Sequence, residues 1–218
     1  MSNLRVVCIS DTHESHRKIR VPDGDLLLFA GDMSFLGEAI AIREFNAWLG
    51  TLHHPNKVVI AGNHDWMFER DATRAEAMIT NATYLNDSGC VIEGLKIWGS
   101  PIQPEFCDWA FNRRRGTQID RHWRMIPDNT DILITHGPPY GILDTSREGS
   151  QHLGCEDLLR AVERVKPKLH VFGHIHGGAG IYKQDCSGGP IFVNAAVLNE
   201  AYKPNGQEFV IDYPLPRV

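Results

Sequence analysis

The chain has 218 residues, 42% hydrophobic and 22% charged, which is the composition of an ordinary globular protein. This length allows one sizeable core, so we expect a single domain over residues 1–218. The net charge of -5 argues against general attraction to nucleic acid or to an anionic membrane, so we expect neither a long nucleic acid nor a membrane as partner. The composition gives no oligomeric state.

Apolar runs in the chain are short. The N-terminal run ends at Asp11, which is too early for a signal peptide or an anchor, and no later run reaches the roughly 18 residues of a membrane span. The five cysteines are scattered and form no CxxC pair, so we expect packing residues rather than metal ligands. These features predict a cytoplasmic location.

Five short apolar runs, each ending in a glycine-containing or polar turn, are typical of buried strands. They are Leu4–Ser10, Asp25–Gly31, Lys57–Asn63, Asp131–Gly137 and Lys168–His174. Apolar residues at helical spacing between them predict helices over 38–52, 70–80 and 155–167. The last of these has acidic residues early and basic residues late, as the helix dipole favours.

Two hairpins and a final strand are expected in the second half of the chain. The first hairpin is Cys90–Pro101, turning at Glu93–Gly94, and the second is Ala179–Ala196, turning through Ser187–Gly189. Gln207–Tyr213 is the final strand. Strands that alternate with helices and are then followed by hairpins indicate an α/β fold with mixed sheets.

Residues of the types that ligate metals follow all five predicted strands, at the ends where a sheet presents ligands. They are Asp11 with His13, Asp32, Asn63 with His64 and Asp65, His136, and His174 with His176. One such residue would mean little, because Asp is common in turns and caps. Such residues at five successive strand ends are not expected by chance. Flanking glycines permit tight turns and close approach to a bound group: Gly31, Gly62, Gly137 and Gly173.

The donor types select a class of metal. Imidazole and carboxylate without thiolate suit Mn, Fe, Zn, Co or Ni. The donors exceed what one ion takes, so we expect two divalent transition-metal ions, with manganese ranked first and Asp32 as a possible bridge. Two ions about 3.5–4 Å apart clamp the attacking and leaving oxygens of an in-line phosphoryl displacement. The pattern therefore predicts a small phosphate ester as substrate, nucleotides among the candidates.

The blocks DTH, GD, GNHD, HGPP and GHIH, in this order from Asp11 to His176, resemble the calcineurin-like metallophosphoesterase superfamily. The resemblance implies a four-layer α/β fold, in which two mixed sheets are sandwiched and flanked by helices, with a dimetal site at the strand ends. It also implies roles for the matching residues: Asp11, His13 and His176 on one metal, Asn63, His136 and His174 on the other, and Asp32 as the bridge. His64 would contact the phosphate and protonate the leaving oxygen.

A narrower resemblance rests on FNRRRG, IPDNTDILITHGPPYGILD, GCEDLL and HVFGHIH with GGAGIY. These stretches are similar to the metallophosphoesterase-domain group of class III, cyclic-nucleotide-like phosphodiesterases. Ala196 departs from the group, which carries an Asn-Ala-Ser type of turn where this chain reads NAA. No residue of the metal-ligand series is missing.

The expected reaction is hydrolysis of phosphodiester bonds in small substrates, by attack of a metal-bound hydroxide with His64 as general acid. A phosphomonoesterase or protein phosphatase is the alternative, since the metal site alone does not separate it. A non-catalytic scaffold on the same fold is disfavoured, because such proteins lose ligands or the acid histidine. The sequence holds no GxSxG block and no plausible Cys–His pair, so no protein nucleophile is expected.

The stretch Gln103–Asn129 is aromatic and basic, with little periodicity. Arg113 and Arg115 are candidate substrate-binding residues, because a basic and aromatic mixture can bind a phosphate and stack a base. The alternative is a solvated basic loop above buried aromatic residues.

Other polar residues near the blocks receive structural interpretations. We interpret Asp65 as a turn residue that accepts backbone N–H groups. His16 is expected on the surface at a helix start, and His53–His54 in a solvated loop. His170 is expected to pack inside the sheet or at its edge.

Overall fold

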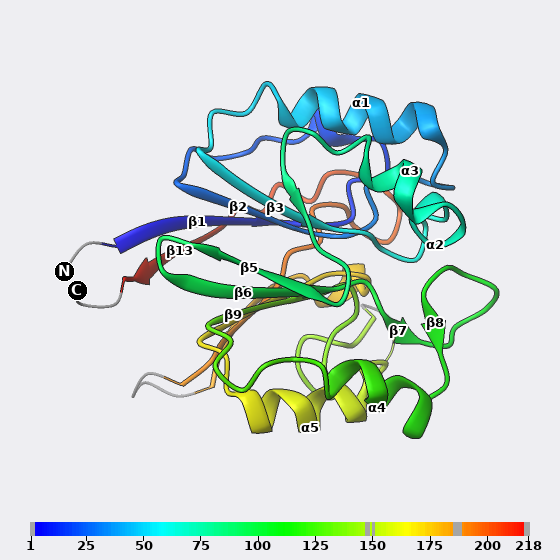
Figure 1. Ribbon diagram of the computed structural model, residues 1–218, viewed down its shortest axis with the longest axis vertical. Coiled ribbons are helices and arrows are strands. Elements are labelled where there is room, and N and C mark those ends of the chain that lie inside the picture. The colour runs from blue at the N-terminus through cyan, green and yellow to red at the C-terminus, as the bar shows by residue number, and fades with distance from the viewer. Residues whose placement is uncertain (1–2, 147–148, 150, 185–188, 216–218) are drawn as a thin grey trace.

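Four layers stack in the molecule, and Figure 1 shows them from top to bottom. The computed structural model describes residues 3–146, 149, 151–184 and 189–215. A five-stranded and a six-stranded sheet pack face to face in the middle. Helix α1 (Ala39–Leu49) covers the first sheet, and α4 (Thr117–Trp123) and α5 (Glu156–Val165) cover the second. The four-layer sandwich expected from the sequence is confirmed.

The first sheet has the strand order β13-β1-β2-β3-β4 and joins the start of the chain to its last strand. Strands β1 to β4 run parallel, and β13 pairs antiparallel with β1. The bounds are β1 Asn3–Ile9, β2 Leu26–Ala30, β3 Asn56–Ile60, β4 Thr83–Tyr84 and β13 Phe209–Pro214. The three expected N-terminal strands and the final strand are confirmed. The N-terminal three end before their polar residues, which leave the sheet for the loops.

The second sheet has the order β11-β12-β10-β9-β6-β5, with four parallel central strands and an antiparallel strand at each edge. The bounds are β5 Ser88–Ile92, β6 Leu95–Ser100, β9 Ile132–Thr135, β10 Leu169–Phe172, β11 Gly180–Lys183 and β12 Ile191–Asn194. Both expected hairpins are confirmed. Glu93 and Gly94 turn the first at φ 51° and 78°, while residues 187 and 188 of the second turn lie outside the described residues.

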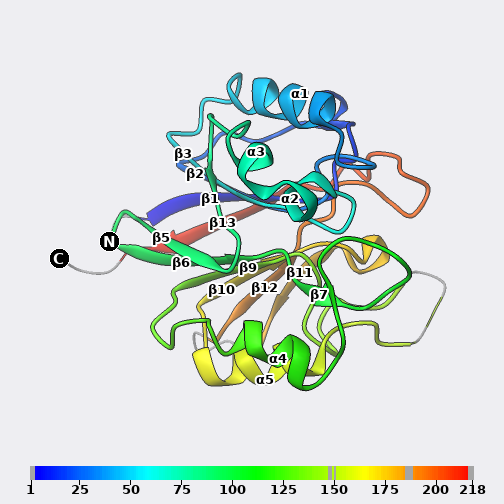
Figure 2. The ribbon, with the colours of Figure 1, turned by 45° about the vertical axis from the view of Figure 1, so that its right-hand side comes forward.

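The remaining elements are short and lie in the connections, as Figure 2 shows for α2, α3 and β7. They are two 3-10 turns at His16–Lys18 and His176–Gly178, α2 Met67–Arg70, α3 Ala72–Glu76, β7 Gln103–Pro104 and β8 Asn112–Arg113. The single helix expected over 70–80 is wrong, because Asp71 has φ -145° and separates α2 from α3. Helix α4 lies inside the stretch that showed little periodicity, since it buries only Ile119 and Trp123.

The core divides along the faces of the strands. In β2, Leu26, Leu28 and Ala30 face the opposite sheet. Leu27 and Phe29 face the helical layer, where Phe29 meets the ring of Phe45 at 4.6 Å. Because both faces of the central strands are covered, these strands are mostly apolar instead of alternating regularly with polar residues, and every residue of β2 is apolar and buried. The packing explains why five short apolar runs were recognisable in the sequence.

Two histidine predictions are wrong. His16 is buried under α1, with its ring 5.2 Å from that of Trp48. The 3-10 turn that carries it packs against the helix, so the ring fills space beneath Trp48. His54 is also buried, whereas its neighbour His53 is exposed, so only half of that pair lies in solvent. His170 is fully buried in β10, as expected.

Candidate metal centre

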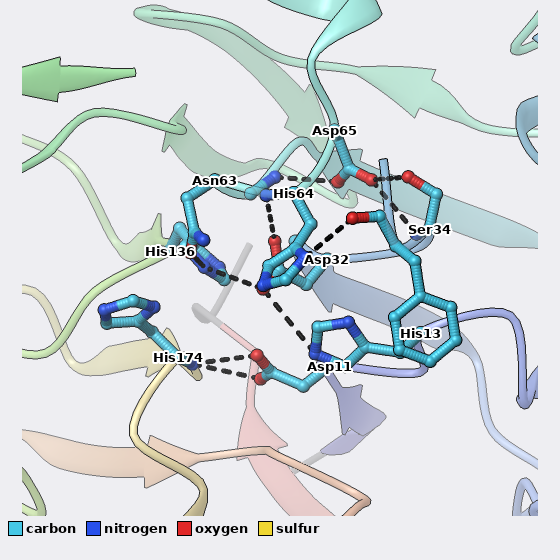
Figure 3. Close-up of polar contacts among 12 residues, drawn as sticks. Asp11, His13, Asp32, Ser34, Asn63, His64, Asp65, His136 and His174 are labelled. Carbon is cyan, nitrogen blue, oxygen red and sulfur yellow. Dashed lines mark hydrogen bonds and ion pairs between the residues drawn. The ribbon is translucent and has the colours of Figure 1, made fainter. Parts of the chain in front are cut away.

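The polar residues that follow five strands meet at one edge of the two sheets, and Figure 3 shows most of them. β1, β2 and β3 of the first sheet and β9 and β10 of the second contribute them. Three overlapping groups have ligand atoms within 4.8 Å of one another: Asp11, His13 and His176; His13, Asp32 and His64; and Asp32, His136 and His174. The convergence that the strand ends suggested is therefore present in the fold.

Asp32 lies at the centre of the cluster. Its Oδ1 accepts the backbone N–H of His64 at 2.9 Å, which fixes the carboxylate. Its Oδ2 faces three imidazoles, at 3.4 Å from His136 Nε2, 3.7 Å from His13 Nε2 and 4.0 Å from His64 Nε2. Burial opposes ionisation, but the imidazoles, His136 foremost, hold the pKa of Asp32 below its usual value. Asp32 thus presents one ionised oxygen to both halves of the cluster.

Asp11 is held by its neighbours in a similar way. It accepts the Ser10 hydroxyl at 2.5 Å and the backbone N–H of His174 at 3.0 and 3.1 Å. The carboxylate is fully buried, and Oδ1 lies 3.5 Å from His176 Nε2. Burial raises its pKa, yet the bond and the charge of His176 lower it overall.

His136 and His176 are oriented by backbone carbonyls. A carbonyl only accepts, so Nδ1–H of His136 donates to Ala30 at 2.9 Å, and that of His176 donates to Asn199 at 3.0 Å. Burial disfavours the charged rings, but nearby carboxylates, Asp32 for His136 and Asp11 for His176, raise both pKa values to about 9. Each ring therefore turns Nε2 toward oxygen atoms in a place suited to a cation.

The donor set fits divalent transition metals. With Nδ1–H of His136 committed to Ala30, its Nε2 lies 2.8 Å from the Asn63 Oδ1 acceptor, so this position is satisfied either by a proton on Nε2 or by a cation between the two atoms. Both ring nitrogens of buried His13 have no hydrogen-bond partner among the described residues. Burial lowers the pKa of His13, and that of His174 to about 4, so both rings are neutral, as a metal ligand must be.

The backbone is strained where the cluster forms. Asp11, His13, Asp32 and His174 all have positive φ, at 57°, 39°, 59° and 66°. Non-glycine residues seldom adopt this left-handed region, and such strain concentrates at functional sites. Gly173 allows the closest approach, because a Cβ there would lie 2.0 Å from Asp11 Oδ2. Gly137 is not needed in this way, since its Cβ would meet nothing nearer than 3.8 Å.

His64 and Asp65 have separate roles in one turn. His64 Nδ1–H donates to the Phe35 carbonyl at 2.8 Å, and its ring lies 4.1 Å from that of Trp109. Asp65 accepts backbone N–H groups from Gly62, Met33 and Ser34 at 2.8, 3.2 and 3.0 Å. The interpretation of Asp65 as a turn residue is confirmed. The turn leaves His64 Nε2 facing the cluster.

Aromatic side chains surround the opening above the cluster. A cavity of about 300 Å³ is lined by His13, Asp32, Asn63, His64, His174 and His176 together with Phe106, Trp109 and Tyr202. Tyr202 had no signal in the sequence, because a single aromatic residue in an irregular loop belongs to no pattern. Phe106 lies in the aromatic and basic stretch Gln103–Asn129, but nothing distinguished it there from the other aromatic residues. The NEAY stretch carries Tyr202, and the PEFC stretch carries Phe106.

The two candidate arginines lie at the margin. Arg113 pairs with Glu69 at 3.2 Å and is not among the residues that line the cavity over the cluster. Arg115 pairs with Glu156, donates to the Gly154 carbonyl at 2.8 Å, and lines an adjoining cavity of about 310 Å³. The two cavities share Phe106, Leu153, His174 and Ile175. Of the two arginines, only Arg115 thus lines a cavity that adjoins the opening above the cluster.

The fold and this cluster define a class of protein. The chain matches the calcineurin-like phosphoesterase family over residues 4–178, and it belongs to that family of hydrolases. It is 41% identical over 237 residues to human metallophosphoesterase domain-containing protein 1, covering 98% of this chain and 72% of the human protein. A UPF0046 protein of Caenorhabditis elegans is 37% identical, with 97% of this chain and 76% of the worm protein covered.

Solved structures agree with this fold. One has a TM-score of 0.67 at 17% identity and covers 97% of this chain and 100% of its own. A crystal structure of a Thermus thermophilus protein has a TM-score of 0.59 at 14% identity and covers 97% and 99% of the two chains. At these identities the likeness shows the fold alone. Within the described ranges, no helix is both long and apolar enough to cross a membrane.

Proposed function

We propose that this protein is a dimetal phosphodiesterase that hydrolyses small phosphodiesters, with nucleotides as the first candidates. The observation that carries the proposal is the buried cluster in which Asp32 faces the imidazoles of both halves. Asp11, His13 and His176 would hold one ion, and Asn63, His136 and His174 the other, with Asp32 between them. Manganese is the first choice, and Fe, Zn, Co or Ni also suit these donors.

Divalent ions in such a site lower the pKa of a bound water and neutralise charge on the phosphoryl oxygens. The chain's own groups supply the rest. Asp32 and Asp11 are fixed by backbone N–H groups, so they need no rearrangement during the reaction. The bond from His64 to the Phe35 carbonyl fixes the imidazole ring. A protonated His64 would therefore direct Nε2–H at the leaving oxygen as the phosphorus–oxygen bond breaks.

The cavity supports a substrate larger than inorganic phosphate. Phe106, Trp109 and Tyr202 line it beside the ligand residues, and aromatic faces suit a planar group attached to the phosphate. Arg115 in the adjoining cavity is the better placed of the two arginines to contact such a group. The phosphomonoesterase, or protein phosphatase, remains the alternative function. Within the described residues, the cysteines at positions 8, 90, 107 and 155 are free, which is in keeping with the cytoplasmic location proposed from the sequence.

The test compares wild type with Asp32→Ala on an aryl phosphodiester and on the matching monoester, with Mn²⁺ added. We expect wild type to turn over the diester faster than the monoester, and Asp32→Ala to lose activity on both. Equal rates in the two proteins would contradict the proposal. A faster monoester reaction in wild type would favour the alternative, and metal analysis of both proteins separates lost binding from lost chemistry.

A further inference from the structure

The histidines of the candidate centre are held in different ways. His136 and His176 each donate Nδ1–H to a backbone carbonyl, which is how proteins commonly orient a ligating imidazole. His13 is just as deeply placed, at 1% exposure, yet neither of its ring nitrogens has a hydrogen-bond partner in the described part of the chain. Without a bound ion, the orientation of the His13 ring therefore depends on contacts other than hydrogen bonds.

Four rings pack against that of His13, and two of them are the imidazoles of His64 and His176, at centroid distances of 4.7 and 5.3 Å. Tyr202 meets the His13 ring edge to face at a centroid distance of 4.9 Å, and Phe35 lies 5.3 Å away at a tilt of 32°. These distances are typical of favourable aromatic pairs. Tyr202 also meets His176 edge to face at 5.5 Å. One tyrosine ring thus contacts both imidazoles of the group formed by Asp11, His13 and His176.

The loop that carries Tyr202 is built to hold its shape. Asn199 Oδ1 accepts the N–H groups of Ala201 and Lys203 at 2.9 and 3.1 Å. Asn205 ties the other end by donating from Nδ2 to the Ala196 carbonyl at 2.8 Å. Between these anchors Tyr202 adopts φ 55°, a left-handed conformation that is strained for an aromatic residue.

The same loop also holds His176 directly. The Asn199 carbonyl accepts the N–H of Tyr202 at 2.8 Å as well as Nδ1–H of His176 at 3.0 Å. The loop over residues 199–205 therefore positions one imidazole by a hydrogen bond and packs on the other through an aromatic ring. The strain at Tyr202 is understandable if placing the ring beside His13 is what the loop achieves.

We propose that Tyr202 is a positioning residue that orients His13 by aromatic packing, and so maintains the metal site of Asp11, His13 and His176. This inference rests on the dimetal function proposed above. The ring makes the contacts, so phenylalanine should replace tyrosine without loss. The other site should keep its affinity, because the ring contacts of Tyr202 in the described residues are to His13, Phe35 and His176 and not to His136 or His174.

The experiment is a titration of metal-free protein with Mn²⁺. Calorimetry measures the heat of binding, and the paramagnetic signal of free Mn²⁺ measures how much of the ion stays unbound. Wild type is compared with Tyr202→Ala, Tyr202→Phe and the control Tyr182→Ala. Tyr182 is matched in exposure, at 44% against 46%, and packs on Phe192 in the second sheet instead. We expect two ions in wild type, Tyr202→Phe and Tyr182→Ala. In Tyr202→Ala, one site should weaken at least tenfold while the other keeps its affinity.

The outcomes separate the two proposals. Two ions bound to Tyr202→Ala with wild-type affinities would overturn the positioning role, and so would the loss of an ion in Tyr202→Phe. Failure of wild type to bind any ion would instead overturn the dimetal function. If circular dichroism shows that Tyr202→Ala does not fold, Tyr202→Leu keeps apolar volume without an aromatic edge and is expected to lose the same ion.

Discussion

Two regions of the molecule hold residues that stood out in the sequence, and the fold treats them differently. The polar residues after five strands converge on one buried cluster. Four arginines of the segment 113–124 pair with acidic side chains, as Arg113 does with Glu69 and Arg124 with Asp120. A residue that follows a buried strand has a position fixed by the sheet. A residue in an irregular segment has no such reference, so its type alone says little about where it lies.

The strongest test of the strand-end cluster is His64→Gln. Glutamine keeps a polar side chain in the turn but supplies no proton to a leaving group, so kcat should fall by about 10²–10⁴-fold. The metal content should stay at the wild-type level, because the proposed ligands are untouched. His53→Gln, at an exposed loop position, is the control and should behave as wild type. Loss of metal together with activity would mean that His64 is itself a ligand.

A pair of glycine variants tests whether close backbone approach sets the cluster geometry. In Gly173→Ala the new Cβ would lie 2.0 Å from Asp11 Oδ2 and 2.1 Å from Ser10 Oγ, so the carboxylate must shift. Displacement of about 1 Å in an active site costs on the order of 10²-fold in kcat/KM. Gly137→Ala has room, with 3.8 Å to the nearest side-chain atom, and should keep near-normal kcat/KM. Equal kcat/KM values for the two variants would refute this geometric account.

The next prediction concerns His170, which lies inside β10, the strand that His174 follows. The hydroxyl of Thr135 donates to the Gly137 carbonyl at 2.8 Å, so His170 Nε2–H must donate to that hydroxyl, and buried Nδ1 has no hydrogen-bond partner among the described residues. Burial lowers the pKa of His170 from 6.5 to about 3. Between pH 6.5 and pH 3, His170 is protonated in the unfolded chain but not in the folded chain. This residue therefore lowers the free energy of unfolding progressively as the pH falls through that range.

The expected slope from His170 is about 1.4 kcal/mol in the free energy of unfolding for each pH unit in that window. Urea unfolding of metal-free protein at pH 7, 6 and 5 measures it. His170→Leu should flatten the pH dependence relative to wild type, whatever its stability at pH 7. An unchanged slope in the variant would show that other buried groups, such as His16, are responsible.

The smallest effects are expected from substitutions in the arginine segment 113–124, which is the other of the two regions compared above. Arg113→Ala breaks a partly exposed ion pair, which is worth about 0–1 kcal/mol of stability, and should leave KM unchanged. Arg115→Ala should raise KM several-fold with little change in kcat, because Arg115 lines the cavity beside the cluster. Steady-state kinetics on the aryl phosphodiester measures both. A larger KM effect from Arg113 would reverse the assignment.

Much of the fold could be predicted because burial on both faces leaves a clear trace in the sequence. Strand β2 is uniformly apolar, β10 is apolar apart from His170, and both end next to glycine. The same clarity extends to the candidate ligands, which come within a few residues of those ends. Their meeting across two sheets could be inferred only through the family resemblance, because strand order and sheet packing are not written in any one segment.

The parts that could not be predicted depend on long-range packing. Tyr202 belongs to no motif, and its importance appears only when its ring is seen beside His13. His16 looked like a surface residue, because nothing near it in sequence shows that Trp48 will cover it. Helix α4 has too few apolar residues to produce a helical pattern. In each case the decisive neighbour lies far along the chain or in another layer.

The division of the candidate ligands between the two sheets has a mechanical consequence. Asp11 and His13 follow β1 in the first sheet, while His176 follows β10 in the second. Asn63 likewise follows β3 in the first sheet, and His136 follows β9 in the second. Each proposed metal site takes its donors from both sheets, so a bound ion would link the two sheets directly. A free ion concentration 100 times the dissociation constant would add about 2.7 kcal/mol to the free energy of unfolding. This stabilisation would oppose separation of the two sheets.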